Sequence, residues 1–112
     1  MESILQVHPD IKGIFCGNDA MAMGAYQALI SADKADDVMV FGFDGAGDVI
    51  NSIQQKKILA TAMQFPKLMA KTAANYAHEY FNGKRNFAQK VPVTVEIVNQ
   101  ENVDEYVAYG SE

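Results

Sequence analysis

Apolar and polar positions follow one arrangement three times along the chain. Each unit begins with a short apolar run, continues through a polar turn and ends in apolar residues at helical spacing. The apolar runs are residues 11–16, 38–43 and 58–63, and helical patterns follow over residues 20–30, from Val49 to near Lys57, and from Pro66 to about Phe81. This alternation predicts an α/β fold with an open, mostly parallel sheet, flanking helices and right-handed crossovers.

The remaining apolar positions extend this prediction at both ends. Residues 38–43 are apolar almost without interruption, which favours a strand buried on both faces by helices. Residues 91–98 read as a last strand, and Pro92 indicates an edge or crossing position. We also expect a short helix that is interrupted at Pro9 and a helical turn that includes Val103 and Tyr106.

Polar and aromatic residues at the helix ends refine the boundaries. Asn18 or Asp19 would be the N-cap of the helix over residues 20–30, and Asp19 and Asp48 fit caps better than ligands. Pro66 suits the first turn of the third helix, and Asn82-Gly83 predicts a left-handed end. The helical spacing of Tyr76 and Tyr80 predicts that both rings lie in the core.

Each of the three predicted strands is followed by a polar side chain. Asn18, Asp44 and Gln64 are separated by one βα crossover each, so parallel strands would place them along one rim of the sheet. One carboxylate that accepts and two amides that donate and accept suit neighbouring hydroxyl groups. Because no Lys or Arg stands at these turns, a sugar or polyol fits better than a phosphate. Simple helix capping and loop polarity remain the alternative at each position.

Composition and charge exclude several other functions. The chain has 112 residues, one cysteine and a net charge of −5, which argues for one domain and against a disulfide framework or a nucleic-acid surface. No apolar run is long enough for direct membrane insertion. His8 and His78 lack partners at metal-ligand spacing, and Cys16 is expected to be a buried small residue. We find no catalytic constellation, so the sequence predicts neither an enzyme nor a cofactor.

Three motifs carry a resemblance to a known family. Residues 15–25 resemble the "N-D-x-M-A-x-G-A" stretch of the type I periplasmic sugar-binding proteins, the ribose-binding group. Residues 40–45 look like that group's "V-x-G-F-D-G", and residues 58–66 look like its "A-T-x-x-Q-x-P". The resemblance implies that Asn18, Asp44 and Gln64 contact a monosaccharide or polyol. It further implies a parent protein that delivers this sugar to an ABC-transporter permease in the periplasm.

The resemblance also implies how the chain is divided. Residues of about 1–64 would form part of the C-terminal lobe, and those of about 65–90 a helix that packs on an absent N-terminal lobe. Residues of about 91–98 would be a crossing strand, and residues 99–112 a tail. Because members of the family are more than twice as long, we expect a C-terminal fragment that binds sugar weakly or not at all by itself. An uncovered sheet edge and an apolar helix face lead us to expect self-association.

A second family shares the expected fold and gives an alternative function. The effector-sensing core of lactose-repressor-type transcription regulators has a similar first motif, but its second motif more often has an aspartate where this chain has Gly45. A small response-regulator-like domain fits less well, because no acidic pair follows an early strand. The first residues lack a basic cluster and therefore a secretory signal, so this chain would be cytoplasmic if it were the whole product.

Overall fold

The computed structural model describes residues 1–109 and divides the chain into two units. We call the first the sheet unit (Met1–Met63 and the chain from Glu96 onward) and the second the α4 unit (Gln64–Val95). The elements are α1 (Glu2–Val7), β1 (Gly13–Phe15), α2 (Asp19–Ser31), β2 (Met39–Asp44), α3 (Gly47–Gln54), β3 (Ala60–Met63), α4 (Pro66–Phe81), β4 (Glu96–Asn99) and the 3-10 helix η1 (Val103–Tyr106).

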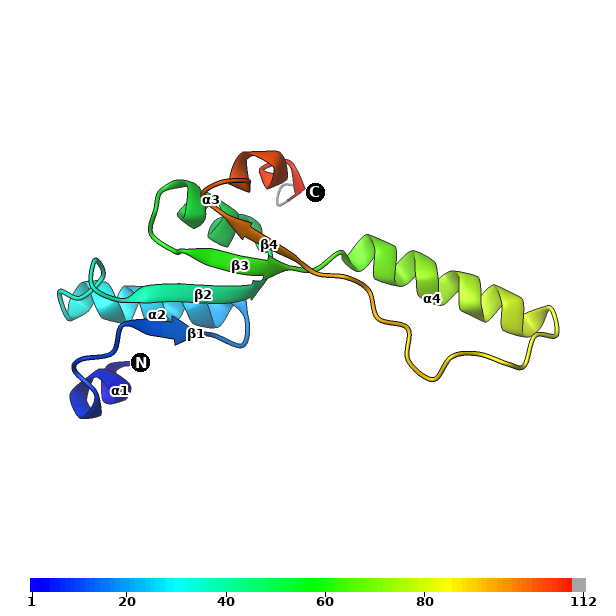
Figure 1. Ribbon diagram of the computed structural model, residues 1–112, viewed down its shortest axis with the longest axis horizontal. Helices are drawn as coiled ribbons and strands as arrows, with labels where there is room; N and C mark the ends of the chain where they lie inside the picture. The colour runs from blue at the N-terminus through cyan, green and yellow to red at the C-terminus, as the bar shows by residue number, and fades with distance from the viewer. Residues whose placement is uncertain (110–112) are drawn as a thin grey trace. The chain divides into compact units, whose positions relative to one another are not determined.

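The sheet has four strands in the order β1-β2-β3-β4 (Figure 1). The first three strands are parallel, and β4 pairs with β3 in the antiparallel direction. This arrangement confirms the predicted fold class and the edge position of the last strand. The predicted strand over residues 91–98 is shorter in the structure, because β3 ends at Met63 and Met63 pairs with Glu96. Residues 91–95 therefore have no strand beside them to continue the ladder.

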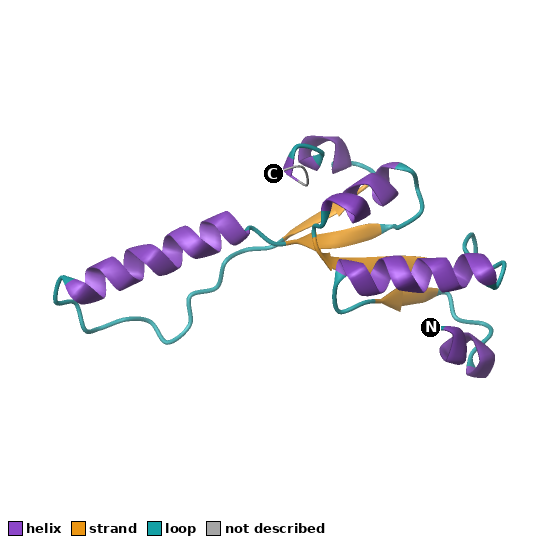
Figure 2. Cartoon of the chain, turned by 180° about the vertical axis from the view of Figure 1, so that it is seen from behind, coloured by secondary structure: helices purple, strands orange, loops and turns teal. Residues whose placement is uncertain are grey.

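Helices α2 and α3 cover the same face of the sheet (Figure 2). As a result burial alternates along β2: Val40 and Gly42 point toward the helices and are buried, whereas Met39 is 50% exposed. The prediction that residues 38–43 are buried on both faces is wrong. Within the described residues, helices cover only one face of the sheet. The side chains of this run that lie on the other face are therefore partly or fully exposed to solvent.

The core of the sheet unit lies between this sheet face and the two helices. Amphipathic α3 inserts Ile50 and Ile53, which are 1% and 0% exposed. Other side chains of this unit are equally inaccessible, among them Leu29 on α2, Val40 on β2, Ile58 just before β3 and Val98 on β4. This packing fixes the position of the turns that follow each strand.

The α4 unit has a helix with the predicted ends and no core. Helix α4 starts with Pro66 in its first turn, and Gly83 follows its end with φ +99°, as a left-handed cap requires. The structure describes every residue of 64–95, and it buries none of them. The prediction of a core position for Tyr76 and Tyr80 is therefore wrong: Tyr80 is 50% exposed, and Tyr76 packs its edge against Phe87.

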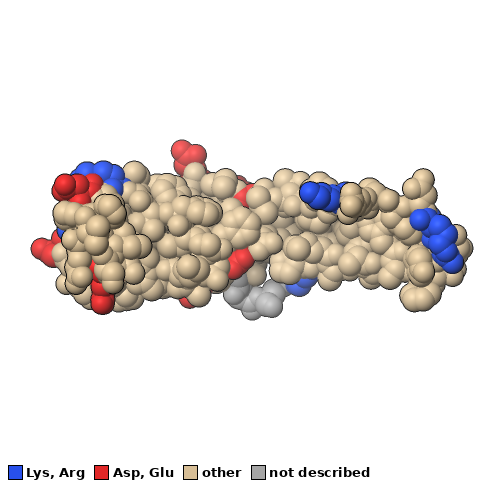
Figure 3. All heavy atoms as spheres, turned by 90° about the horizontal axis from the view of Figure 1, so that it is seen from below, with Lys and Arg blue, Asp and Glu red and all other residues tan. Residues whose placement is uncertain are grey.

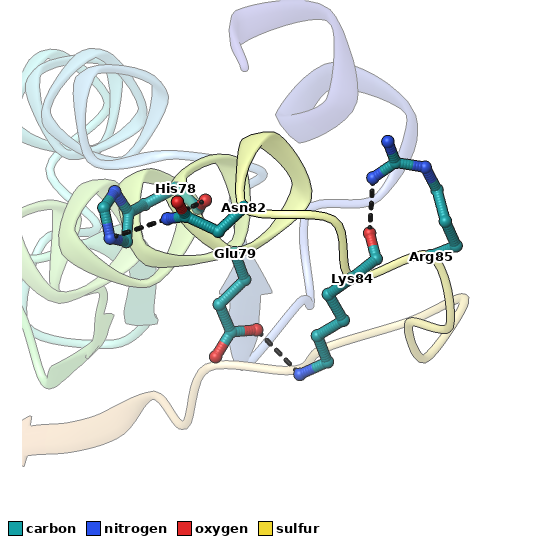
Figure 4. A network of polar contacts seen from close by, with 5 residues as sticks. All are labelled: His78, Glu79, Asn82, Lys84 and Arg85. Atoms are coloured by element: carbon teal, nitrogen blue, oxygen red, sulfur yellow. Dashed lines mark hydrogen bonds and ion pairs between the residues drawn. The ribbon is translucent and has the colours of Figure 1, made fainter.

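Local polar contacts close the C-terminal end of α4 (Figure 4). Lys84 Nζ lies 2.7 Å from Glu79 Oε2, and Asn82 Nδ2 donates to the carbonyl oxygen of His78 at 2.9 Å. Arg85 Nη1 donates to the carbonyl oxygens of Tyr80 and Lys84. The carbonyl oxygens of His78 and Tyr80 also accept backbone N–H groups of Asn82 and Gly83, so these side-chain contacts add to the backbone hydrogen bonds that end the helix.

Candidate functional site

The carboxyl ends of β1, β2 and β3 meet at one edge of the sheet. The Cα partner of Phe15 is Phe41, and the partner of Asp44 is Met63. The turn after β1 holds Asn18, and Asp44 is the last residue of β2. Ligands of open α/β sheets bind outside this edge, so the structure puts Asn18 and Asp44 in neighbouring turns where a ligand is expected.

Asn18 is the N-cap of α2. Its φ of −156° is extended, and its Oδ1 accepts a hydrogen bond of 2.8 Å from the backbone N–H of Met21. The prediction that Asn18 or Asp19 caps this helix is confirmed for Asn18. Since capping occupies the oxygen, the Nδ2 amide is the group that Asn18 can offer as a donor at the sheet edge.

Asp44 has an unusual backbone conformation for a residue other than glycine. Its φ is +121°, and conformations this sparsely populated cost about 1–3 kcal/mol. Gly45 follows with φ +86°, and a Cβ at that position would lie 2.5 Å from Met63 Cγ, so only glycine fits. The Asp44 side chain is exposed. The turn thus presents a carboxylate to solvent on a strained backbone.

Asp19, in the first turn of α2, connects the turn after β1 to the turn after β2. Its Oδ2 accepts hydrogen bonds from the backbone N–H groups of Gly45 (2.8 Å) and Ala46 (2.7 Å). Its Oδ1 accepts a 2.7 Å hydrogen bond from Thr61 Oγ1 on β3. The prediction that Asp19 is a cap is wrong, because its carboxylate turns away from its own helix toward β2 and β3.

The environment of Asp19 is tightly packed and dry. Asp19 and Thr61 are each 1% exposed. Burial raises the pKa of the Asp19 carboxyl above its ordinary value and the nearby Asp44 charge adds to the rise, while the three hydrogen bonds act in the opposite direction. Gly42 provides the space: a Cβ there would lie 2.1 Å from Asp19 Oδ1.

Gln64 directly follows Met63, the last residue of β3, and begins the α4 unit. Within that unit it lines a groove of about 350 Å³ together with Met69, Tyr76 and Val93. The structure thus brings Asn18 and Asp44 to one edge and describes Gln64 as part of the other unit. The role of Gln64 beside the other two residues stays a prediction.

The other residues considered from the sequence are Cys16 and the two histidines. Cys16 is buried, and this burial raises the pKa of its thiol. His8 and His78 are exposed. Within residues 1–109, no group of three or more His, Cys, Asp or Glu side chains is placed to hold a metal ion. None of the helices in this range combines the length and the apolar character needed to cross a membrane.

Sequence reasoning missed the exposed Phe15 and Met21 at this edge and the linking role of Asp19. Phe15 and Met21 are 71% and 58% exposed and line one depression beside the Asn18 turn, which periodicity alone could not reveal. The link through Asp19 had a signal in Gly42, because a glycine inside a buried strand often marks a close approach by another group.

Comparisons with known proteins identify the family of the chain. Residues 1–85 match the family described as "Periplasmic binding protein domain". The chain is 45% identical over 85 residues to the ribose import binding protein of Bacillus subtilis, an alignment that covers 76% of this chain and 27% of the relative. It is 43% identical over 103 residues to the D-apiose import binding protein of Paraburkholderia graminis, covering 91% of this chain and 33% of the relative.

A solved structure gives the same result for the fold. An ABC transporter periplasmic solute binding protein from Actinobacillus succinogenes with bound D-allose superposes with a TM-score of 0.85 at 34% identity, covering 94% of this chain and 36% of that one. The chain thus spans about a third of the length of the relatives it matches. Because the family match extends over most of the chain and the sheet topology agrees, this chain belongs to the periplasmic binding protein family, in its type I fold.

Proposed function

We propose that this chain contributes sugar-contacting residues to a substrate-binding protein for ABC-transporter uptake. The observation that carries the proposal is the exposed Asp44 carboxylate at the carboxyl end of β2, in the turn next to Asn18. Relatives named for ribose and D-apiose import and a related structure with bound D-allose support a monosaccharide or polyol as ligand.

The three polar residues have different parts in this proposal. Asp44 accepts hydrogen bonds from two adjacent hydroxyl groups, whereas the Nδ2 amide of Asn18 donates to a hydroxyl oxygen. Gln64, one residue beyond the Met63 partner of Asp44, completes the polar ring. Hydrogen bonds to a charged group contribute about 1.5–3 kcal/mol each, more than those between neutral groups. Asp44 is therefore the largest contributor of the three.

The wider setting belongs to the same proposal. We infer that the parent protein works in the periplasm and hands its sugar to an ABC-transporter permease. Residues of about 65–90 would pack on the N-terminal lobe, and residues of about 91–98 would cross between lobes. The names of the relatives favour transport over the lactose-repressor-type alternative.

A chimera tests the role of Asp44. In this chimera, the aligned 103 residues of the Paraburkholderia graminis D-apiose relative are replaced by those of this chain. The rest of the relative supplies the other lobe. Calorimetric titration with D-apiose should then show binding that Asp44→Ala weakens at least tenfold, because one charged hydrogen bond is worth about that much.

The matched control is Asp37→Ala, which removes the same charge from an exposed position before the opposite end of β2. It should leave the dissociation constant within about twofold, since surface charges away from a ligand contribute little. Unchanged binding by the Asp44 variant in a folded chimera would refute the proposed role.

The 112-residue chain by itself should bind sugar weakly or not at all. With one lobe, the sugar keeps one side in water and its hydrogen bonds compete with solvent. Titration of the chain with D-apiose checks this point, and a micromolar dissociation constant would contradict it.

We also propose that the isolated chain self-associates. The α4 unit exposes apolar side chains, including Leu68 (51%) and Phe81 (84%), and helices with such faces normally lie against a partner. Sedimentation velocity at increasing concentration should show species larger than a monomer. A single compact monomer at all concentrations would contradict self-association.

A further inference from the structure

The Asp44–Gly45 turn needs an external support. Two successive residues have positive φ, +121° and +86°, and the backbone N–H groups of Gly45 and Ala46 point away from the sheet ladder. An unpaired backbone donor in a partly buried place is costly, so the turn depends on whatever accepts these two hydrogen bonds. The acceptor is Oδ2 of Asp19, from the first turn of α2.

A carboxylate suits this position better than other side chains. Asp19 meets three donors with two oxygens, and an ionised carboxyl is the side chain of this size that only accepts. Its location in the first turn of α2 adds the favourable field of the helix N-terminus. Thr61 holds the second oxygen from β3, so helix α2, the turn after β2 and strand β3 are joined through one buried group.

We propose that Asp19 is the positioning residue of the sugar site: supported by Thr61, it holds the strained turn so that Asp44 presents its carboxylate at the sheet edge. This inference rests on the proposed function. Asp19 does not touch the sugar, because it is 1% exposed below the turn. It acts only through the backbone that follows Asp44.

The space at Gly42 gives independent support for this role. An added Cβ at Gly42 would lie 2.1 Å from Asp19 Oδ1 and 3.2 Å from its Cγ. The strand has no side chain at the one point where the carboxylate crosses it on the way to Thr61. Among the described residues, no buried side-chain nitrogen or oxygen lacks a hydrogen-bond partner, so this polar link is complete.

Amide hydrogen exchange on the full 112-residue chain is the first test. Asp19→Ala should speed exchange of the Gly45 and Ala46 amides at least tenfold relative to the change at Val40 and Gly42. Asp19→Asn should restore most of the protection, because its carbonyl oxygen can accept from both amides while its NH₂ donates to Thr61 Oγ1. General destabilisation would instead speed all of these amides equally, and that result would overturn the proposal.

Thr61→Val provides a milder variant in case Asp19→Ala does not fold. It keeps the side-chain shape, removes the donor to Asp19 Oδ1 and should give a smaller local loss that Thr61→Ser reverses. Asp48→Ala is the control: among the described residues its carboxylate accepts from the N–H of the next residue, Val49, and not from Gly45 or Ala46, so the exchange of these two amides should stay within twofold.

Sugar affinity is the second test, made with D-apiose and the chimera described above. Asp19→Ala should weaken binding about tenfold when Asp44 is present and by less than twofold in an Asp44→Ala background, since Asp19 acts through the side chain of Asp44. An equal loss in both backgrounds would overturn the positioning role. If the chimera does not bind D-apiose or D-ribose, the proposed function fails with it, and the exchange data still show separately whether Asp19 holds the turn.

Discussion

The two units of this chain contain similar fractions of apolar residues and use them in different ways. The sheet unit buries side chains from α2, α3 and all strands except β1, whereas the α4 unit buries none of its residues. The charges differ as well. Residues 64–95 carry five Lys or Arg and one Glu, whereas the rest of the chain carries four Lys and thirteen Asp or Glu. On the face drawn in Figure 3, the acidic side chains lie mainly over the sheet unit, which also shows basic ones, whereas the charged side chains seen over the α4 unit are basic.

The difference teaches what each unit requires for stability. Burial of apolar surface is the main favourable term in folding, so the sheet unit can support strained turns such as the one at Asp44. Helix α4 has 16 residues, little more than the ~12–15 below which isolated helices are marginal in water, and most helical stability in proteins comes from tertiary packing. The sheet unit is therefore suited to hold Asn18 and Asp44 in fixed positions.

The largest expected effect comes from removing one buried side chain. Ile53→Ala should lower the free energy of unfolding by about 2–5 kcal/mol, because it leaves a cavity in the core. Leu68→Ala on α4 should change it by less than about 0.5 kcal/mol, since its side chain is half exposed. Urea denaturation followed by circular dichroism measures both. Equal losses would show that the α4 unit has a core of its own.

Glycine substitutions give the next largest effect and distinguish packing from backbone conformation. Gly42→Ala should destabilise the sheet unit by about 1–3 kcal/mol, because its Cβ overlaps Asp19. Gly83→Ala meets no atom within 4 Å, so only its φ of +99° opposes the change, at about 1 kcal/mol.

Urea denaturation measures the loss of stability in Gly42→Ala, and the helical circular dichroism signal measures fraying of α4 in Gly83→Ala. If Gly42→Ala were neutral, the close contact with Asp19 would not exist in solution.

The smallest expected effect is a pH dependence in the sheet unit. Burial raises the pKa of Asp19, so between its ordinary value and its folded value the native chain holds more protons than the unfolded chain. The stabilising contribution of Asp19 is therefore complete at low pH and decreases as the pH rises through the folded pKa. The nearby charge of Asp44 strengthens this direction.

Urea denaturation at a series of pH values, with Asp19→Asn as the reference that cannot titrate, measures this contribution. The free energy of unfolding of the original chain, minus that of Asp19→Asn, should decrease as the pH rises. A difference that grows more favourable with pH would show that the three hydrogen bonds outweigh burial.

Periodicity and local signals predicted most elements of this fold. The alternation of apolar runs and helical patterns led to three parallel strands and their helices, and Pro66 and Gly83 mark the ends of α4 closely. Errors occurred where a partner surface decides the outcome. The run over residues 38–43 lacks a helix on one face within the described chain, and Tyr76 and Tyr80 have helical spacing without a core to enter.

The candidate site was predictable in its outline only. Spacing by one crossover placed Asn18 and Asp44 at a common edge, because parallel strands share the direction of their carboxyl ends. Local sequence could not tell whether Asp19 or Asn18 caps α2, since both residue types suit that position. The contact of Asp19 with Gly45 and Thr61 joins residues 26 and 42 positions apart, which no local pattern encodes.

By itself, the sequence determined the order and type of the elements and the edge of the sheet that carries polar side chains, because these follow from the periods of helix and strand. Only the tertiary structure decided which apolar residues are buried. It also decided that the Asp19 carboxylate accepts hydrogen bonds from the turn and that the Asp44 carboxylate is exposed at the sheet edge. Both depend on what lies opposite a residue in space, and that neighbour comes from distant parts of the chain.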